Sequence, residues 1–253
     1  MADQAGLTDE PAGPTTGAPL PYAAICLVRH SESTWITEAR FQGRADPPLS
    51  VLGEHQARLV ARRLRDRHLP PALPVPGSPP QAIWHSPLSR GAATAARIAD
   101  DLAMTAALRA DEALVELGQG EWEGLTHAYV QGRWPVELAA WRADPVAAQA
   151  PGGERLRDGS ERVAAFVDRI LHEMAGSAGT TAPWSIVVSH DGILRLMLMR
   201  LLDIPLERFW AFPFPVAGIS VIDLVEGRPR LRAHALTDHL AAEADSADRG
   251  GAL

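Results

Sequence analysis

The sequence predicts an α/β fold, a layered sandwich in which helices flank a largely parallel central sheet. Short apolar runs typical of buried strands alternate along the chain with longer segments whose apolar residues recur at helical spacing. The helical patterns on both sides of a proline-dense stretch, residues 69–80, need the same sheet to cover. We therefore expect one sheet and one domain.

The expected domain covers residues 21–240. Residues 1–20 are rich in Gly, Pro and Thr and are expected to form a flexible arm. They lack the basic start and apolar stretch of a signal peptide. Residues 241–253 are small and polar, so we expect a flexible tail.

Two strands and two helices are expected in the first half of the domain. In order, they are a buried strand over Tyr22–Val28, a helix from Ser50 to about His68, a strand over Ala82–His85 and a helix from about Leu88 to Leu102. The apolar residues of the first helix fall on one face, which would cover the sheet.

The second half repeats the alternation with longer loops. The expected elements are a strand over Leu108–Glu116, a glycine-interrupted loop over Gly118–Gly132, a short helix over Trp134–Arg142, a loop over Pro151–Gly159, a helix capped by Ser160, a strand over Ser185–Ser189, a helix over Ile193–Leu202, and closing strands over Gly218–Leu224 and Leu231–Ala235.

Composition and charge limit the partners. The net charge of −7 repels nucleic acid and anionic membranes, so we expect neither as a partner, and an anionic substrate would need a local cluster of arginines. The one cysteine, Cys26, lies in an apolar run and excludes a disulfide within the chain. The longest apolar run falls well short of a membrane span, so the cytoplasm is the expected location. A homo-oligomer stays open.

Two predicted strands end in residues that carry chemistry. The first is followed by His30, directly after Arg29, and the later strand is followed by His190, Asp191 and Gly192. Ligand sites of open α/β sheets lie outside the carboxyl ends of the strands. We therefore expect both histidines to face one crevice.

Residues 27–33 resemble the Arg-His-Gly signature of the histidine phosphatase superfamily, which includes cofactor-dependent phosphoglycerate mutases. Five further blocks resemble the family and occur in its order: residues 41–57, with Phe41, Gln42, Gly43 and Asp46; residues 86–95, with Ser86, Pro87 and Arg90; residues 114–124, with Glu116 and Trp122; residues 151–154; and residues 188–195. Six ordered blocks make the resemblance specific.

The resemblance implies a site that suits phosphoryl transfer. His30 would be the nucleophile, since a neutral imidazole is a good nucleophile near pH 7, and His190 would stabilise charge in the transition state. Arg29 and Arg90 would bind the phosphate oxygens. Glu116 would protonate the departing oxygen and then activate water. Neither a cofactor nor a metal is expected.

Three positions depart from the family pattern. Ser31 and Asp191 stand where the family commonly has glycine, and Ile36 stands where many members have an asparagine that donates to the phosphate. Thr37 could replace that donor only if its loop shifted by one residue. A carboxylate repels phosphate, so Asp191 should point away, toward a backbone donor or an arginine.

The favoured function is hydrolysis of a small phosphorylated metabolite through phosphohistidine. A phosphoglycerate mutase-type reaction is the main alternative, but the short segment between Glu116 and His190, with its Pro151–Glu154 loop, favours a phosphatase. A catalytically weak binding protein on the same fold also stays open. A metal-dependent hydrolase using His30, His190, Asp191 and His85 has little support, because no spaced histidine pair is present.

Overall fold

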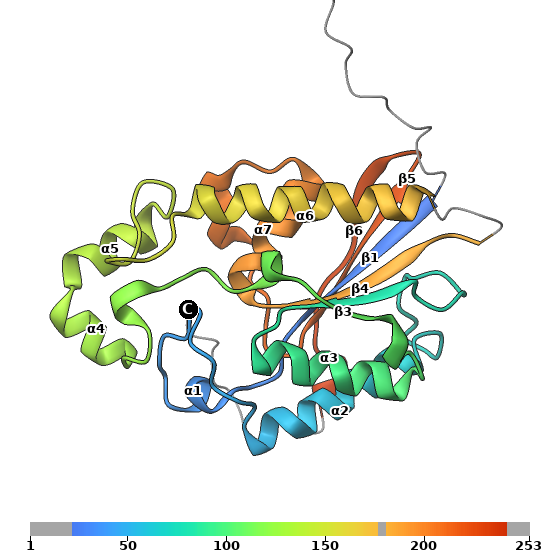
Figure 1. Cartoon of the computed structure of the whole chain (residues 1–253), viewed down its shortest axis with the longest axis horizontal. Coiled ribbons are helices and arrows are strands. Elements are labelled where there is room, and N and C mark those ends of the chain that lie inside the picture. Colours follow the sequence, from blue (N-terminus) through green and yellow to red (C-terminus); the bar gives the residue numbers. More distant parts are fainter. Residues whose placement is uncertain (1–21, 177–180, 242–253) are drawn as a thin grey trace, which may run out of the picture.

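The structure is a computed structural model, and it describes residues 22–176 and 181–241 (Figure 1). The expected arm, residues 1–20, and all but the first residue of the expected tail, 241–253, lie outside the described residues. Within the described ranges, no helix is both long and apolar enough to span a bilayer.

A six-stranded sheet forms the centre of the fold, in the order β3-β2-β4-β1-β5-β6. The strands are β1 (Tyr22–Arg29), β2 (Ala82–His85), β3 (Leu108–Ala110), β4 (Trp184–Ser189), β5 (Ile219–Val225) and β6 (Arg228–Leu236). Strands β1 to β4 pair in parallel, whereas β5 and β6 add an antiparallel edge. This arrangement confirms the predicted α/β fold with a largely parallel sheet.

Four long helices cover the two faces of the sheet. They are α2 (Val51–Arg65), α3 (Ser89–Asp101), α6 (Leu156–Gly176) and α7 (Asp191–Leu202). In Figure 1, α6 and α7 lie above the sheet, and α2 and α3 lie below it.

Strand β1 supplies both faces of the core by alternation. Ala24, Cys26 and Val28 pack in the cluster that contains α2 and α3. Ala23, Ile25 and Leu27 pack in the cluster that contains α6 and α7. This is the two-residue period expected of a strand that is buried on both faces.

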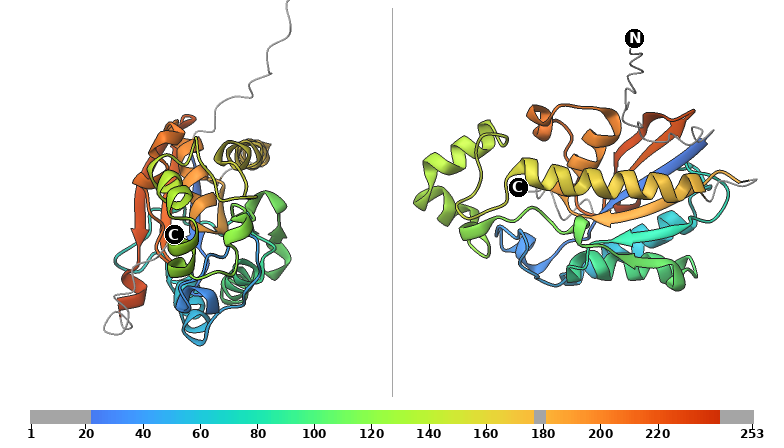
Figure 2. Two further views of the ribbon diagram at one scale, coloured as in Figure 1. Left: turned by 90° about the vertical axis from the view of Figure 1, so that its left-hand side faces the viewer. Right: turned by 45° about the horizontal axis from the view of Figure 1, so that its top comes forward.

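The remaining helices are shorter. They are α1 (Thr34–Thr37), α4 (His127–Arg133), α5 (Pro135–Ala143) and four 3₁₀ turns, η1 (Thr105–Ala107), η2 (Glu112–Leu114), η3 (Gly120–Trp122) and η4 (Leu206–Ala211). Figure 2 shows α4 and α5 beyond the end of the sheet, apart from the long helices. They close over a small aromatic core formed with Phe41, Trp122 and Trp141.

Three expected elements are wrong in their bounds. Only residues 108–110 of the expected strand over 108–116 form a strand, because β2 offers just Ile83–His85 for pairing and Asp111 then caps η2 by accepting from the Ala113 N–H. The expected loop over 118–132 contains α4, which Thr126 caps.

Ser160 does not cap a helix, since α6 begins upstream at Leu156. Leu156 is buried in the main core, so packing extends the helix by a full turn beyond the cap that the sequence suggested.

Candidate active site

Parallel pairing of β1 with β4 brings the two strand-end histidines together. Arg29 pairs with Ser189 in register, and the His30 N–H donates to the Ser189 carbonyl over 2.8 Å. The imidazole rings of His30 and His190 have centroids 5.0 Å apart and are tilted by 58°. The parallel register therefore brings the two rings together as expected, although only His30 lines the cleft described below.

His30 is held in one orientation and one tautomer. Its Nδ1 lies 2.7 Å from the Ser31 carbonyl oxygen. A carbonyl only accepts, so Nδ1 carries the proton and Nε2 keeps a free lone pair. Burial lowers the pKa of His30 well below its usual value, and the positive charges of Arg90 and Arg29 lower it further. The ring is neutral at pH 7.

His190 is held in place by Ser86, the residue that follows β2. Its Nε2 and the Ser86 hydroxyl lie 2.8 Å apart, and both residues are fully buried. Burial is the main cause that lowers the pKa of His190, and the charge of Arg90 adds to the effect. Ser86 lies directly after β2, so three adjacent parallel strands position this pair.

Arg90 is a buried cation near the start of α3. Its guanidinium donates to the carbonyls of Ala45 and Gly43 over 2.8 and 2.9 Å. Burial lowers the pKa of Arg90 to about 10, which leaves it charged at neutral pH. The Thr94 hydroxyl joins this helix to the first strand end, because it accepts from the Ser31 N–H and donates to the Arg90 carbonyl.

Arg29 and Asp191 share the main chain of Phe214. Arg29 donates to the Phe214 carbonyl over 2.6 Å, and the Phe214 N–H donates to Asp191 over 2.8 Å. Asp191 also pairs with Arg195 at 2.9 Å, and both side chains are almost fully buried. The prediction that Asp191 points toward a backbone donor or an arginine is confirmed on both counts.

The carboxylate of Glu116 is seated by two main-chain donors. Leu117 N–H donates to Oε1 over 2.8 Å and Gly192 N–H donates to Oε2 over 3.3 Å. Burial raises the pKa of Glu116, while these N–H groups oppose the shift and the charge of Asp191 adds to it. A side chain at Gly192 would displace this carboxylate, since its Cβ would lie 2.7 Å from Oε1.

A second ion pair holds the main chain around Glu116. Arg162 pairs with Glu154 at 2.9 Å and donates to the carbonyls of Ala113 and Glu116. Glu154 in turn accepts from the Gly118 N–H. The loop over 151–154 that the sequence singled out therefore supports the Glu116 segment from behind.

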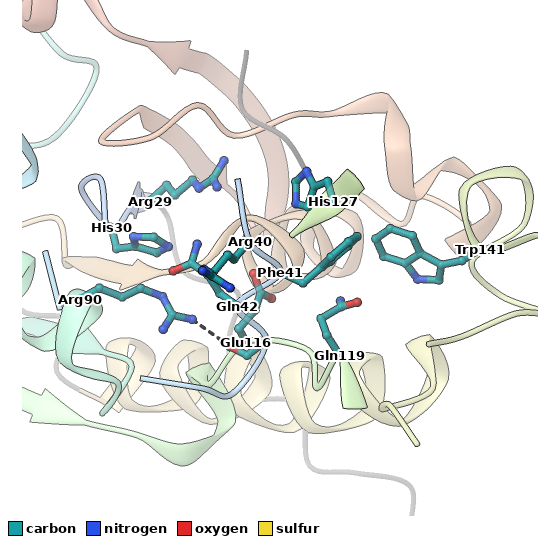
Figure 3. A pocket seen from close by; sticks show the side chains of 11 residues that line it. Arg29, His30, Arg40, Phe41, Gln42, Arg90, Glu116, Gln119, His127 and Trp141 are labelled. Atoms are coloured by element: carbon teal, nitrogen blue, oxygen red, sulfur yellow. Dashed lines mark hydrogen bonds between the residues drawn. The ribbon is translucent and has the colours of Figure 1, made fainter. Parts of the chain in front are cut away.

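One open cleft collects several of these groups. It is lined by Arg29, His30, Arg40, Phe41, Gln42, Gly43, Arg90, Glu116, Gln119, His127 and Trp141. Figure 3 shows Arg29, His30 and Arg90 at one end, the aromatic rings at the other, and Glu116 and Gln42 between them. His190 packs behind His30 and does not line the cleft.

The departures from the family pattern have different outcomes. Ser31 fits, fully buried, with its N–H bonded to Thr94. Ile36 and Thr37 are absent from the cleft lining, and the exposed Thr37 hydroxyl donates to the Thr34 carbonyl instead. Thr37 therefore does not replace the missing asparagine. Gln42 does face the cleft, and the Ser33 hydroxyl donates to its Oε1, which leaves the amide nitrogen as its free end.

Sequence reasoning missed Arg40, Gln119 and the role of His127. His127 begins α4, inside the segment expected to be a loop, and its ring lines the cleft with its centroid 4.4 Å from that of Phe41. Arg40 and His127 come together through a bridge between Arg40 and Thr126, which no local pattern signals.

A metal site is not evident. Within residues 22–176 and 181–241, no group of three or more His, Cys, Asp or Glu side chains is placed to hold a metal ion.

Comparisons with known proteins give the family. The model of the histidine phosphatase superfamily (branch 1) matches residues 25–237. Phosphoserine phosphatase 1 of Hydrogenobacter thermophilus is 32% identical over 219 residues, which are 85% of this chain and 93% of that protein. A glucosyl-3-phosphoglycerate phosphatase of Mycolicibacterium vanbaalenii is 30% identical over 197 residues, 77% of this chain and 78% of that protein.

Solved structures agree with this assignment. A mycobacterial glucosyl-3-phosphoglycerate phosphatase in complex with VO3 has a TM-score of 0.72 at 25% identity, over 85% of this chain and all of that one. The alpha-ribazole phosphatase from Shigella flexneri has a TM-score of 0.70 at 25% identity, over 84% of this chain and 96% of that one. The chain therefore belongs to branch 1 of the histidine phosphatase superfamily and is a phosphatase.

Proposed function

We propose that the protein hydrolyses small phosphate monoesters through a phosphorylated His30. The observation that carries the proposal is the free Nε2 of a neutral His30 in a cleft that also holds Arg29, Arg90 and Glu116. Small phosphorylated metabolites are the proposed substrates, because the similar proteins are named for phosphoserine, glucosyl-3-phosphoglycerate and alpha-ribazole phosphates.

In the first step, Nε2 of His30 attacks phosphorus and the bond to the ester oxygen breaks. Arg29 and Arg90 bind the phosphate oxygens as fixed cations, so they stabilise charge without rearranging. His190 stabilises charge on the transferring group from behind His30. Glu116 gives its proton to the departing oxygen, and its raised pKa favours the protonated form that this step needs.

In the second step, water replaces the alcohol. Glu116, now ionised, takes a proton from the water as its oxygen attacks phosphorus. The phosphorus–nitrogen bond breaks, inorganic phosphate leaves, and His30 and Glu116 return to their starting states. One carboxyl group thus acts as acid and then as base.

Water is the proposed acceptor rather than a second substrate hydroxyl. A mutase must grip two anionic groups while its intermediate reorients. The main candidate cations in the loops between Glu116 and His190 are Arg133, Arg142, Arg155 and Arg157, and the described cleft lining includes none of them. Arg155 pairs with Asp158, and Arg142 donates to Gln131.

The proposal is tested by trapping the intermediate. Wild-type enzyme quenched during turnover should carry an acid-labile phosphate on His30, detected by mass spectrometry, and His30→Ala should lose both the phosphate and the activity. Full activity in His30→Ala would refute the proposal. Rapid isomerisation of 3-phosphoglycerate with 2,3-bisphosphoglycerate, without phosphate release, would make the protein a mutase.

We further propose a cytoplasmic location, as the sequence led us to expect. The described cysteine, Cys26, is free and buried, so the fold uses no disulfide there. Fractionation of cells that produce the chain from its own gene would test this.

A further inference from the structure

The cleft has a second end whose residues have no role in the phosphoryl transfer. Phe41, His127 and Trp141 form a wall of rings there, and Gln119 lies beside them in Figure 3. The ring centroids of Phe41 and Trp141 lie 6.5 Å apart, and the two rings meet edge to face. This end holds whatever the phosphate is attached to, because Glu116 lies between it and His30.

The ring wall is rigid. Trp141 packs edge-on against Trp122 and Trp210, with ring centroids 5.8 and 4.8 Å away. Trp122 belongs to the small aromatic core described above, and Trp210 packs against that core. Phe41 is almost fully buried. Burial also lowers the pKa of His127, so its ring is neutral at pH 7. Pre-formed apolar walls of this kind bind ring faces better than they bind charged groups.

Gln119 adds an unsatisfied polar atom. Its Oε1 is buried and has no hydrogen-bond partner in the structure. Its main chain is fixed, because the Gln119 N–H donates to Glu123 over 2.8 Å. The next residue, Gly120, has a φ of +51°, and the Glu121 N–H donates to the Pro151 carbonyl over 2.9 Å. Leaving a buried amide atom without a hydrogen-bond partner costs free energy. A substrate hydroxyl would supply that partner whether the oxygen or the nitrogen of the amide faces the cleft, since a hydroxyl both donates and accepts.

The cation at this end is already engaged. Arg40 pairs with Glu38 at 2.5 Å and donates to the Gly124 carbonyl over 2.6 Å. The charge of Glu38 offsets that of Arg40, so a second anionic group on the substrate gains little there.

We propose that this end of the cleft binds an uncharged ring bearing hydroxyl groups, so that the preferred substrate is a sugar phosphate rather than the phosphate ester of a short charged acid. The proposal rests on the proposed function and adds the substrate class. Gln119 is the specificity-determining residue, and the rings of Phe41, His127 and Trp141 form the apolar wall beside it.

The first test compares kcat/KM for hexose and pentose phosphates with kcat/KM for phosphoserine, 3-phosphoglycerate and ethyl phosphate, by released phosphate. We expect the best sugar phosphate to exceed all three by at least about 10-fold. Phosphoserine and ethyl phosphate lack the hydroxyl that Gln119 would bind, and 3-phosphoglycerate has a hydroxyl but places a carboxylate against the apolar rings. A higher value for phosphoserine or 3-phosphoglycerate would overturn the inference.

The second test uses Gln119→Leu, which keeps the volume and removes the amide. The ratio of kcat/KM for the best sugar phosphate to that for ethyl phosphate should fall about 10- to 100-fold. A ratio measured on one preparation does not depend on the folded fraction. Gln131→Leu is the matched control, because Gln131 is exposed on α4 and outside the cleft, and it should leave the ratio unchanged.

An equal loss on both esters in Gln119→Leu would also overturn the inference. These failures differ from failure of the proposed function. Hydrolysis of p-nitrophenyl phosphate without a preference for sugars would refute the substrate class alone. No hydrolysis of any ester would refute the proposed function and this inference with it.

Discussion

Replacing Asp191 with alanine should destabilise the protein strongly. Asp191 and Arg195 form a buried pair in which the side chains are 1% and 4% exposed. Removing one partner of such a pair leaves the other charge uncompensated in a medium of low dielectric, which costs about 3–5 kcal/mol. A domain of this size loses about 2–4 °C of Tm per kcal/mol, so Tm should fall by about 6–20 °C.

The change should also reach the site. The Phe214 N–H loses its acceptor, and the Phe214 carbonyl is the partner of Arg29. Phosphate binding should therefore weaken, which would raise both KM and the inhibition constant for inorganic phosphate in the folded fraction.

Differential scanning calorimetry of three proteins tests the argument. The double variant Asp191→Asn with Arg195→Met removes both charges, keeps an acceptor for Phe214 and provides a side chain of similar reach. It should recover most of the Tm lost in Asp191→Ala. The reasoning fails if Asp191→Ala melts within about 2 °C of the wild type, or if the double variant is no more stable than the single one.

Three further outcomes are expected from the site. Glu116→Gln should lower kcat about 100- to 1000-fold for alkyl phosphates and much less for p-nitrophenyl phosphate, whose leaving group needs no proton; an equal loss on both would argue against a proton donor at Glu116. The pKa of His30 is lowered, so its neutral, nucleophilic form persists as pH falls through 6.5; the acid limb of kcat/KM that belongs to His30, after correction for substrate ionisation, should lie well below 6.5. Activity should survive dialysis against a chelator, and a loss restored by one particular metal would contradict the proposed chemistry.

The sequence predicted the parts of the site that are local to strand ends. Arg29, His30 and His190 each follow an apolar run, and the parallel register then brings them together. The partners of Asp191, a backbone N–H and an arginine, were also predicted, because a carboxylate repels phosphate and must point away from it.

The other end of the cleft could not be predicted in this way. His127, Arg40 and Gln119 come from separate loops, and their positions depend on a bridge from Arg40 to Thr126 and on a turn closed against Pro151. Contacts between distant loops leave no period in the sequence. The short strand β3 has a similar cause, since its length is set by the three residues of β2 that pair with it, Ile83–His85, and not by its own apolar run.

The alternation along β1 has a consequence for how errors in the enzyme would appear. Sliding this strand by one residue would send His30 to the wrong side and would, in the same movement, exchange the residues that fill the two halves of the interior. A well-folded population with a misdirected His30 is therefore not accessible. Mutations that destabilise β1 should lower the amount of folded protein in the cell. Mutations in the distant loops can change substrate preference while His30 keeps its position.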